Sequence, residues 1–395
     1  MNLSIAAGAV PSRETEDALM DWTYSNPVRI EFGADSFDKL PGLIGKRAYA
    51  LVTYGEPVFD ELERRLRAAA GPSVLTIRDV APNPDYRLLT EQAARFAGLA
   101  SQPEVIVAIG GGSVIDSAKV FAAAGGDFAT VKTYLETQQG AERLAAIPII
   151  AVPTTAGTGS EVTCWGTVWD EASGKKYSLA RPSLYPTHAV IDPRLMLGKP
   201  QLLTISTGLD ALSHALESIW NVNNNPVSAN HAVAAARSIL DVLPKLANDL
   251  GNLELRSRMA QAALFAGLAF SNTKTAIAHS LSYPITLRHG VQHGIACSFS
   301  LPMVLRSVKG AGGLCEDSLK QIFGADLARA ADDLEDFMAR LGISCNPAAY
   351  RIERAEWHAL IADSLEGERG RNFLGSKERL IEAAQTLRMP SSVSA

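Results

Sequence analysis

Four side chains suited to binding a metal ion lie in the second half of the chain. Asp210 and His214 stand four residues apart in STGLDALSHALES, so a helix would place both on one face. His279 and His293 follow in AIAHSLSYPITLRHGVQHG. Imidazole suits iron and zinc, and one carboxylate offsets part of the charge of such an ion. With no cysteine expected nearby, the pattern disfavours a closed structural zinc site.

Each of these residues also has an ordinary structural explanation. Thr207 and Asp210 have the spacing of a capping box at the start of a helix. A single histidine in a helix is most often a satisfied core or surface residue. Four such groups in one region, two of them at helical spacing, favour the metal site.

A glycine-rich turn is the second feature with chemical meaning. Residues 104–119 read EVIVAIGGGSVIDSAK, so a buried strand runs into Gly110, Gly111 and Gly112 just where a helix opens. Glycines let the backbone approach a pyrophosphate, and free amides at a helix start stabilise its charge. Ser113 could cap the helix or bond a phosphate oxygen. The pattern is neither GxGxxG nor a Walker A loop, so a tight turn without a ligand remains an alternative.

A second loop follows another apolar strand. Residues 152–163 read VPTTAGTGSEVT, which offers several small hydroxyl side chains with glycines between them. A loop that satisfies its own backbone is the alternative explanation. Two such loops at the carboxyl ends of parallel strands together strengthen the prediction of a ligand site, because open α/β sheets bind ligands at that edge.

The elements that must position these groups change character near residue 200. Before it, short apolar runs alternate with helical patterns, which indicates βαβ units and a parallel sheet. After Lys199-Pro200 come long Ala/Leu-rich stretches, which predict helices. The candidate strands are 47–53, 73–77, 104–109 and 147–152, the candidate helices before the break are 58–70 and 88–99, and the helical stretches after it are 208–220, 227–249, 254–283, 316–341 and 352–364. The predicted organisation is an extension (1–20), an α/β dinucleotide-binding domain (21–200) and an all-helical domain (201–395).

Composition narrows the class of partner. With 37 basic and 42 acidic residues, the net charge is −5, which gives no reason to expect nucleic acid or an anionic membrane. No apolar run approaches the roughly 20 residues of a membrane span, and the first residues lack a signal-peptide pattern. The four cysteines show no CxxC pairing and are interpreted as reduced. We therefore expect a cytoplasmic protein.

The motifs together resemble the iron-containing (group III) alcohol dehydrogenase family. The resemblance covers about residues 22–375 and includes FGADSFDKL, GGGSVIDSAK, PTTAGTGSEVT, DPRL, TGLDALSHALES, HSLSYP and HGVQHG, in that order. It implies a dehydroquinate synthase-like architecture in which the active site lies between a dinucleotide-binding domain and a helical domain. It also implies Fe(II), or zinc on the same ligands, together with NAD(H) or NADP(H), in an enzyme that is commonly a homodimer.

The resemblance assigns roles to individual positions. The implied metal ligands are Asp210, His214, His279 and His293, and the implied cofactor contacts are Gly111, Gly112, Ser113, Asp116, Thr154, Thr155, Thr158 and Lys176. The metal would polarise a carbonyl oxygen, and the nicotinamide would exchange a hydride with its carbon. Aldehyde reduction is the expected direction on thermodynamic grounds.

Two departures from the family pattern bear on the chemistry. Tyr283 stands where most members have a histidine that relays protons, and a tyrosine of pKa ~10 is a poorer shuttle unless shifted. We nevertheless predict Tyr283 and His289 as the catalytic side chains. After the first strand, Thr53-Tyr54-Gly55 lacks the aspartate typical of NAD-preferring members and resembles members that accept NADP.

Basic residues near the ligands suggest the substrate class. Lys274, Arg288 and Arg371 are the predicted substrate contacts, with Arg369 in the same ERGRN segment as Arg371. Such groups suit a phosphonate, phosphate or carboxylate, although a solvated surface is the alternative. The stretch NTKTAIAHSLSY is also similar to the phosphonoacetaldehyde-reductase branch. The sequence thus predicts reduction of a small aldehyde, with an anionic aldehyde as the sharper hypothesis.

Three other classes are weighed against this prediction. A dehydroquinate synthase-like enzyme would use NAD and a metal without net redox turnover. A maleylacetate-reductase-like enzyme would need no metal, and the four predicted ligands disfavour it. A binding protein that lost its chemistry is disfavoured for the same reason. Bound metal and steady cofactor oxidation separate these classes.

Overall fold

A six-stranded sheet organises the first part of the chain in this computed structural model, which describes residues 21–385. The predicted extension, residues 1–20, lies outside the described residues. The strand order is β1-β8-β5-β4-β2-β3, and all neighbours are parallel. The strands are β1 Arg29–Phe32, β2 Tyr49–Val52, β3 Leu75–Ile77, β4 Val105–Gly110, β5 Ile149–Pro153 and β8 His188–Ile191. The predicted α/β class is confirmed.

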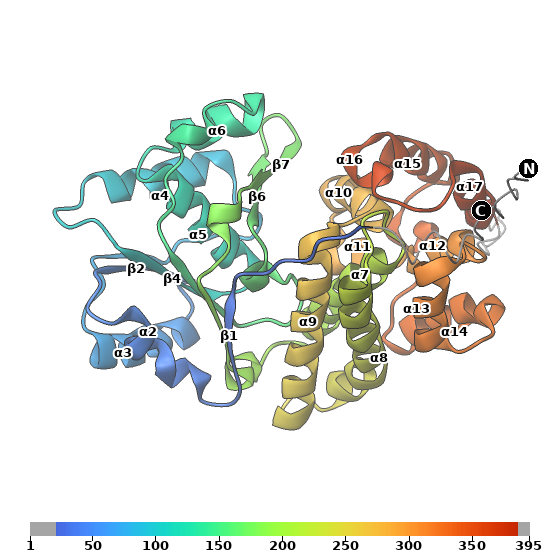
Figure 1. Ribbon diagram of the computed structural model, residues 1–395, viewed down its shortest axis with the longest axis horizontal. Helices are drawn as coiled ribbons and strands as arrows, with labels where there is room; N and C mark the ends of the chain where they lie inside the picture. The colour runs from blue at the N-terminus through green and yellow to red at the C-terminus, as the bar shows by residue number, and fades with distance from the viewer. Residues whose placement is uncertain (1–20, 386–395) are drawn as a thin grey trace, which may run out of the picture.

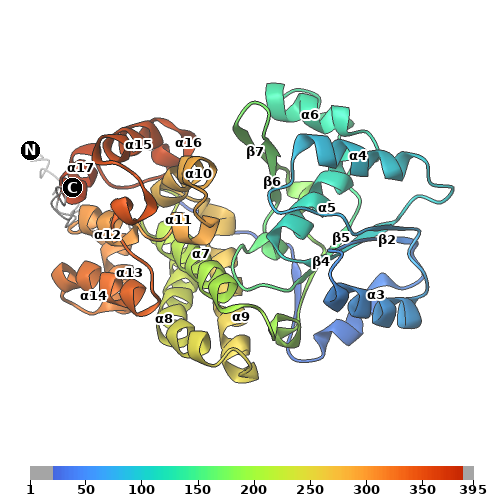
Figure 2. The same ribbon diagram turned by 180° about the vertical axis from the view of Figure 1, so that it is seen from behind.

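Burial on both faces explains the apolar composition of the central strands. β4 and β5 are buried at every position, as expected for a parallel sheet covered on both sides. Because side chains alternate along a strand, Ile106 and Ala108 face the core under α4, α5 and α6, whereas Val105 and Val107 face the core under α2 and α3. Figures 1 and 2 show these two layers. Their helices are α2 Leu40–Ile44, α3 Pro57–Ala70, α4 Tyr86–Ala97, α5 Gly112–Ala124 and α6 Phe128–Thr137.

An antiparallel hairpin that the sequence patterns did not predict follows β5. Its strands are β6 Trp165–Asp170 and β7 Lys175–Ala180. Gly166 allows β6 to lie close to α5, since a Cβ there would stand 3.0 Å from the Asp116 carbonyl oxygen. On β7, Lys176 reaches the helical region, where its ammonium lies 3.7 Å from the centre of the Tyr283 ring. The hairpin thus carries a charged group from the sheet to the second half of the chain.

Helices form the rest of the described chain, and one continuous apolar core joins them. They are α7 Gln201–Ile219, α8 Pro226–Asn248, α9 Leu253–Thr273, α10 Ile277–His289, α11 His293–Ala296, α12 Leu301–Val308, α13 Gly313–Phe323, α14 Leu327–Arg340, α15 Arg354–Glu366, α16 Glu368–Arg371 and α17 Lys377–Gln385. The stretches 254–283 and 316–341 each form two helices, because Lys274 and Gly324 adopt positive φ angles. None of the described helices is long and apolar enough to cross a membrane.

An extended segment before β1 holds the two parts of the fold together. The Tyr24 hydroxyl donates to the carbonyl oxygen of Leu268 on α9, and the Asn26 amide donates to Val162 and Ser271. Figure 1 shows this segment running from the helical region to β1. The loop after β5 also packs on α7 and α9, since a Cβ on Gly157 would stand 2.8 Å from Thr207 and one on Gly159 would stand 2.7 Å from Gly267.

Candidate metal and cofactor site

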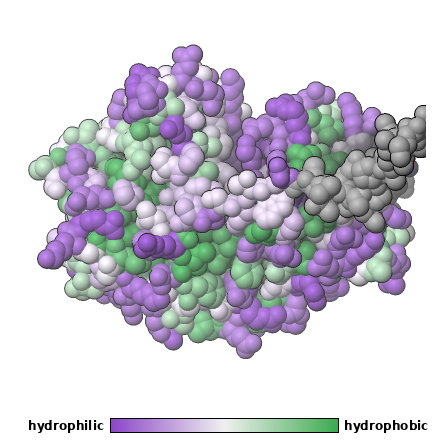
Figure 3. All heavy atoms as spheres, in the orientation of Figure 1, coloured by the Kyte–Doolittle hydropathy of each residue, from purple (hydrophilic) through white to green (hydrophobic). Residues whose placement is uncertain are grey.

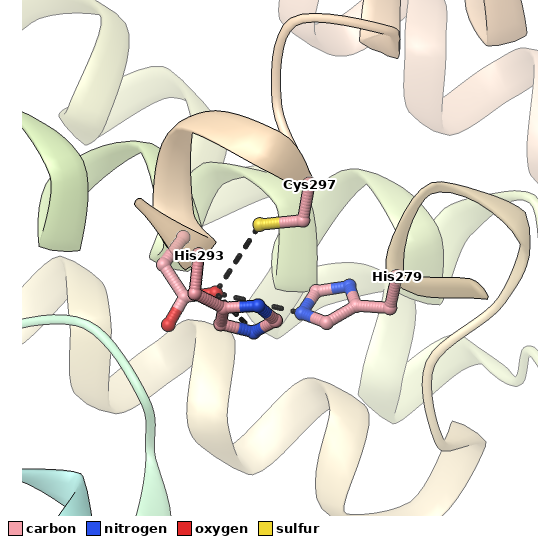
Figure 4. Close-up of side chains that lie close together, drawn as sticks. His279, His293 and Cys297 are labelled. Atoms are coloured by element: carbon pink, nitrogen blue, oxygen red, sulfur yellow. Dashed lines mark hydrogen bonds and ion pairs between the residues drawn. The ribbon is translucent and has the colours of Figure 1, made fainter. Parts of the chain in front are cut away.

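The structure brings the four predicted metal ligands together. Asp210 and His214 come from α7, His279 from α10 and His293 from the start of α11. From Asp210 Oδ1, the Nε2 atom of His279 lies at 3.4 Å, and those of His214 and His293 each lie at 3.9 Å. Asp210 is only 3% exposed. Figure 4 shows the His279 and His293 rings turned toward one another.

The chemistry of these side chains fits a divalent ion. His279 Nε2 is buried and has no hydrogen-bond partner among residues 21–385, so its position beside Asp210 suits a ligand atom. Burial lowers the pKa of His214 to about 4 and that of His293 to about 3, so both rings are neutral at pH 7. A metal requires neutral imidazole and an ionised carboxylate. One carboxylate and three imidazoles together form a ligand set suited to iron or zinc.

The local fold explains why these side chains converge. α7 is buried on nearly all sides, which is possible because its polar groups face one another or backbone atoms. The His214 ring stacks on Phe270 of α9 and on His279. Thr207 lies inside α7 and donates to the carbonyl oxygen of Leu203, so the capping-box alternative was wrong.

Glu217 is a functional side chain that the sequence analysis missed. Its carboxylate is fully buried and accepts hydrogen bonds from the backbone N–H groups of Ala276 and Ala278. It also lies 2.6 Å from His279 Nδ1. This contact fixes the ring so that Nε2 is the free atom, as outer-shell carboxylates do in metal sites. The signal was present, since Asp210, His214 and Glu217 share one helical face.

Replacing Glu217 with glutamine should weaken metal binding about ten- to hundredfold. The amide keeps the shape of the side chain, but its NH2 group would meet backbone donors where an oxygen now accepts. Chelator competition, with thermal melting to check folding, measures the effect. Glu356→Gln is the matched control, because Glu356 pairs with His289 instead of a metal-site residue. Unchanged affinity in a folded Glu217→Gln protein would contradict this role.

A cysteine also lies at the site, which corrects the prediction that none stands near it. The Cys297 thiol donates to Asp210 Oδ1 at 3.4 Å, and Figure 4 shows it beside the histidine pair. Its sulfur lies within 4.8 Å of the ligand atoms of Asp210, His279 and His293. Burial raises the pKa of the Cys297 thiol well above its usual value, so the group acts as a donor that orients the carboxylate. Its spacing of four residues after His293 was the available signal.

The glycine turn lies at the carboxyl end of β4. α5 begins at Gly112 with Gly111 as its N-cap, and no side chain caps it, so Ser113 does not serve as the cap. A Cβ on Gly111 would stand 3.3 Å from Thr155 Oγ1, and one on Gly112 would stand 2.7 Å from the Thr158 methyl carbon. A side chain at Gly112 would therefore displace Thr158. The helix start suits a pyrophosphate.

Asp116 and Lys119 tie the second loop to the glycine turn. Asp116 accepts from the Ser160 hydroxyl at 2.6 Å and from the Thr167 backbone N–H at 2.9 Å. The buried Lys119 ammonium donates to the carbonyl oxygens of Ser160 and Trp165. Both predicted cofactor loops are thereby held on α5. Thr154 is buried beside them, and its backbone N–H donates to the carbonyl oxygen of Gly110.

The predicted catalytic and substrate residues do not all lie at the metal cluster. Tyr283 stacks on His293 with ring centres 6.0 Å apart, so it adjoins the metal cluster. The other predicted residues have partners away from it: Lys274 pairs with Glu368, Arg288 and His289 face Glu356, and Arg371 donates to the carbonyl oxygen of Glu366. Arg369 is the arginine whose guanidinium lies over the Tyr283 ring, at 4.8 Å.

Comparison with known proteins gives the same family for both halves. Residues 27–193 match the model "Iron-containing alcohol dehydrogenase", and residues 204–374 match "Fe-containing alcohol dehydrogenase family, C-terminal". NAD-dependent methanol dehydrogenase of Bacillus methanolicus is 32% identical over 67% of this chain and 71% of that protein. Phosphonoacetaldehyde reductase of Streptomyces viridochromogenes is 34% identical over 62% of this chain and 67% of that protein.

A solved structure extends the likeness to nearly the whole fold. Sulfoacetaldehyde reductase from Bifidobacterium kashiwanohense, in complex with NAD+, superposes with a TM-score of 0.86 at 30% identity. The match covers 94% of this chain and 100% of that one. The chain belongs to the iron-containing alcohol dehydrogenase family.

Proposed function

We propose that this enzyme reduces a short-chain aldehyde that bears an anionic group, of the type represented by phosphonoacetaldehyde. The observation that carries the proposal is a pair of cations beside the metal cluster. Lys176, which the resemblance implied as a cofactor contact, lies 3.7 Å from the centre of the Tyr283 ring, and Arg369 lies 4.8 Å from it. The Tyr283 ring itself stacks on His293. Among residues 21–385, neither cation has a carboxylate at ion-pair distance.

The charge balance of this cluster favours an anion. Arg369 and Lys176 repel each other strongly enough that Arg369 contributes to lowering the pKa of Lys176. The Arg369 Nε–H donates to the Thr275 hydroxyl, a neutral acceptor. A phosphonate or sulfonate beside Tyr283 would neutralise both cations with charge-assisted hydrogen bonds. The relatives named for phosphonoacetaldehyde and sulfoacetaldehyde support this substrate class.

The proposed mechanism assigns separate tasks to the two halves of the fold. When bound, a metal ion would polarise the aldehyde oxygen, and a reduced nicotinamide would supply the hydride. The glycine turn and the loop that carries Thr155 and Thr158 are the residues that would hold the cofactor. Burial raises the pKa of Tyr283 to about 12, so its hydroxyl keeps its proton at neutral pH and serves as the donor to the product oxygen.

Matched aldehydes test the proposal directly. Steady-state cofactor oxidation should show kcat/KM at least about tenfold higher for phosphonoacetaldehyde and sulfoacetaldehyde than for propanal, because the anion gains charge-assisted contacts. Propanal has a similar size and no charge, so it is the control. Equal or better turnover of propanal would overturn the anionic-substrate proposal and leave the family assignment intact.

The preference for an anion should decline as pH rises above about 7. Burial, and then the charge of Arg369, lower the pKa of Lys176 to about 7, while Asp116, Asp210 and Cys297 oppose the shift. The ammonium is present below that pH and lost above it, so contact with an anion weakens as pH rises. The measurement is the ratio of kcat/KM for sulfoacetaldehyde to that for propanal between pH 6 and 9. The sulfonate stays ionised throughout, so a flat ratio would contradict the role of Lys176.

The remaining predictions belong to the same proposal. A dehydroquinate synthase-like activity is the alternative, and steady oxidation of cofactor by an aldehyde would exclude it. A cytoplasmic location is part of this proposal.

A homodimer is also part of this proposal. β1 forms an open edge of the sheet, and Ile30 on this strand is 37% exposed. Figure 3 shows hydrophobic residues gathered around the strand. An open edge strand is a suitable place for a second chain to pair.

A further inference from the structure

A cavity at the carboxyl edge of the sheet continues the cofactor site away from the metal. Its lining includes Thr155 of the second loop and Leu203 and Thr207 of α7. Leu203, Thr207, Asp210 and His214 follow one another along one face of α7. Thr155 also adjoins Gly111 of the glycine turn. A dinucleotide with its nicotinamide at the metal and its pyrophosphate at the glycine turn would direct its adenosine end toward the residues that line this cavity.

Two cations line the cavity, and neither has an acidic partner at ion-pair distance among the described residues. Arg256 is 5% exposed and donates only to neutral acceptors, which are the carbonyl oxygens of Leu250 and Lys199 and the hydroxyl of Thr204. Lys199 is partly buried, and burial lowers its pKa while the charge of Glu56 opposes that shift. Glu56 is exposed, so solvent screens it. Since buried charges are ordinarily paired, the cavity has the character of a phosphate site.

The position of Lys199 links the cavity to the end of β2. Its ammonium lies 5.2 Å from the centre of the Phe59 ring, and Phe59 packs edge-on against Tyr54. In dinucleotide-binding folds, an acidic residue near this strand end bonds the adenosine ribose of NAD, whereas a cation there accommodates the 2′-phosphate of NADP. Thr53 donates its hydroxyl to the carbonyl oxygen of Ile109, and Tyr54 bonds Ser113. Neither side chain brings a negative charge.

We propose that Lys199, supported by Arg256, recognises the 2′-phosphate of the adenosine ribose, so that this enzyme prefers NADPH to NADH. The inference rests on the proposed function only in that a dinucleotide binds at the glycine turn. It requires no particular aldehyde. Lys199 is the specificity-determining residue, because it is partly exposed toward the cavity, while Arg256 holds the backbone of Lys199 in place.

Binding of adenosine nucleotides to the full-length, metal-loaded enzyme tests the proposal without turnover. Isothermal titration should give about tenfold tighter binding of 2′,5′-ADP than of 5′-ADP, the value expected for one charged hydrogen-bonded contact. Lys199→Met should remove this difference, and Lys199→Arg should keep it. Lys245→Met is the matched control, because Lys245 pairs with Asp241 on the surface of α8 and should change neither affinity.

Two results would overturn the assignment. Equal affinity of the wild-type enzyme for both nucleotides would show that the 2′-phosphate is not recognised. Equal weakening of both by Lys199→Met would show that Lys199 holds the pyrophosphate instead. Neither result depends on aldehyde turnover, so a failure here is distinct from a failure of the anionic-aldehyde proposal.

Discussion

Replacing His293 with alanine should remove the metal and lower kcat on the order of a thousandfold, which corresponds to about 4 kcal/mol of transition-state stabilisation. His293 is the best position for this experiment because its side chain is 34% exposed and its removal leaves no buried carboxylate without a partner. His279 is less suitable, since its loss would remove the ring that faces the buried Glu217 carboxylate, and breaking a buried pair of this kind costs about 3–5 kcal/mol of stability.

Metal analysis and steady-state rates on the same preparation measure both effects. His188→Ala is the matched control, because His188 lies on β8 and contacts Thr187 instead of the metal cluster. The control should keep full metal content and turnover. A His293→Ala protein that retained metal and rate would contradict the ligand set, whereas one that retained metal but lost rate would indicate a role in substrate binding alone.

Replacing Arg369 with leucine should lower kcat/KM for phosphonoacetaldehyde about a hundredfold while changing that for propanal by less than about threefold. The reason is the position of the guanidinium over Tyr283, beside Lys176 and the metal cluster. Its loss removes one of the two charges that would hold the anion and leaves the reacting carbonyl group untouched.

Arg371→Leu supplies a matched control from the same short helix. Arg371 is exposed and donates to the carbonyl oxygen of Glu366, so its loss should leave both aldehydes nearly unchanged. The sequence alone favoured Arg371 as the substrate contact. If Arg371→Leu lowered the anionic rate and Arg369→Leu did not, the sequence-based assignment would stand and the structural one would be wrong.

The parts of the fold that sequence predicted well are those with strong local patterns. The central strands are continuous apolar runs buried on both faces, and α3 and α4 show clear amphipathic spacing. The α/β class could therefore be predicted from the sequence, although the strand order could not. The hairpin β6–β7 was not predicted, because the strand KKYSLA has only Tyr177 and Leu179 at alternating apolar positions, a pattern too short to predict a strand that pairing with β6 stabilises.

The sequence predicted those site residues whose positions depend on local geometry better than those whose positions depend on packing between helices. Asp210 and His214 share a helical face, so their convergence follows from local geometry. The segment ERGR contains two arginines, and no local pattern indicates which of them points toward the metal cluster. The answer depends on how α16 packs against α10. Cys297 was dismissed because cysteine spacing was compared with zinc motifs, although it follows His293 by one helical turn.

Anaerobic cofactor oxidation by the purified enzyme with phosphonoacetaldehyde, before and after chelation, tests the central claim most directly. Iron(II) and zinc are added back separately, and NADH and NADPH are compared. We expect that chelation abolishes turnover, that a divalent ion restores it, and that NADPH supports the faster reaction. Turnover that persists without metal, or a metal-loaded enzyme that oxidises neither cofactor with any aldehyde of the panel, would contradict the account.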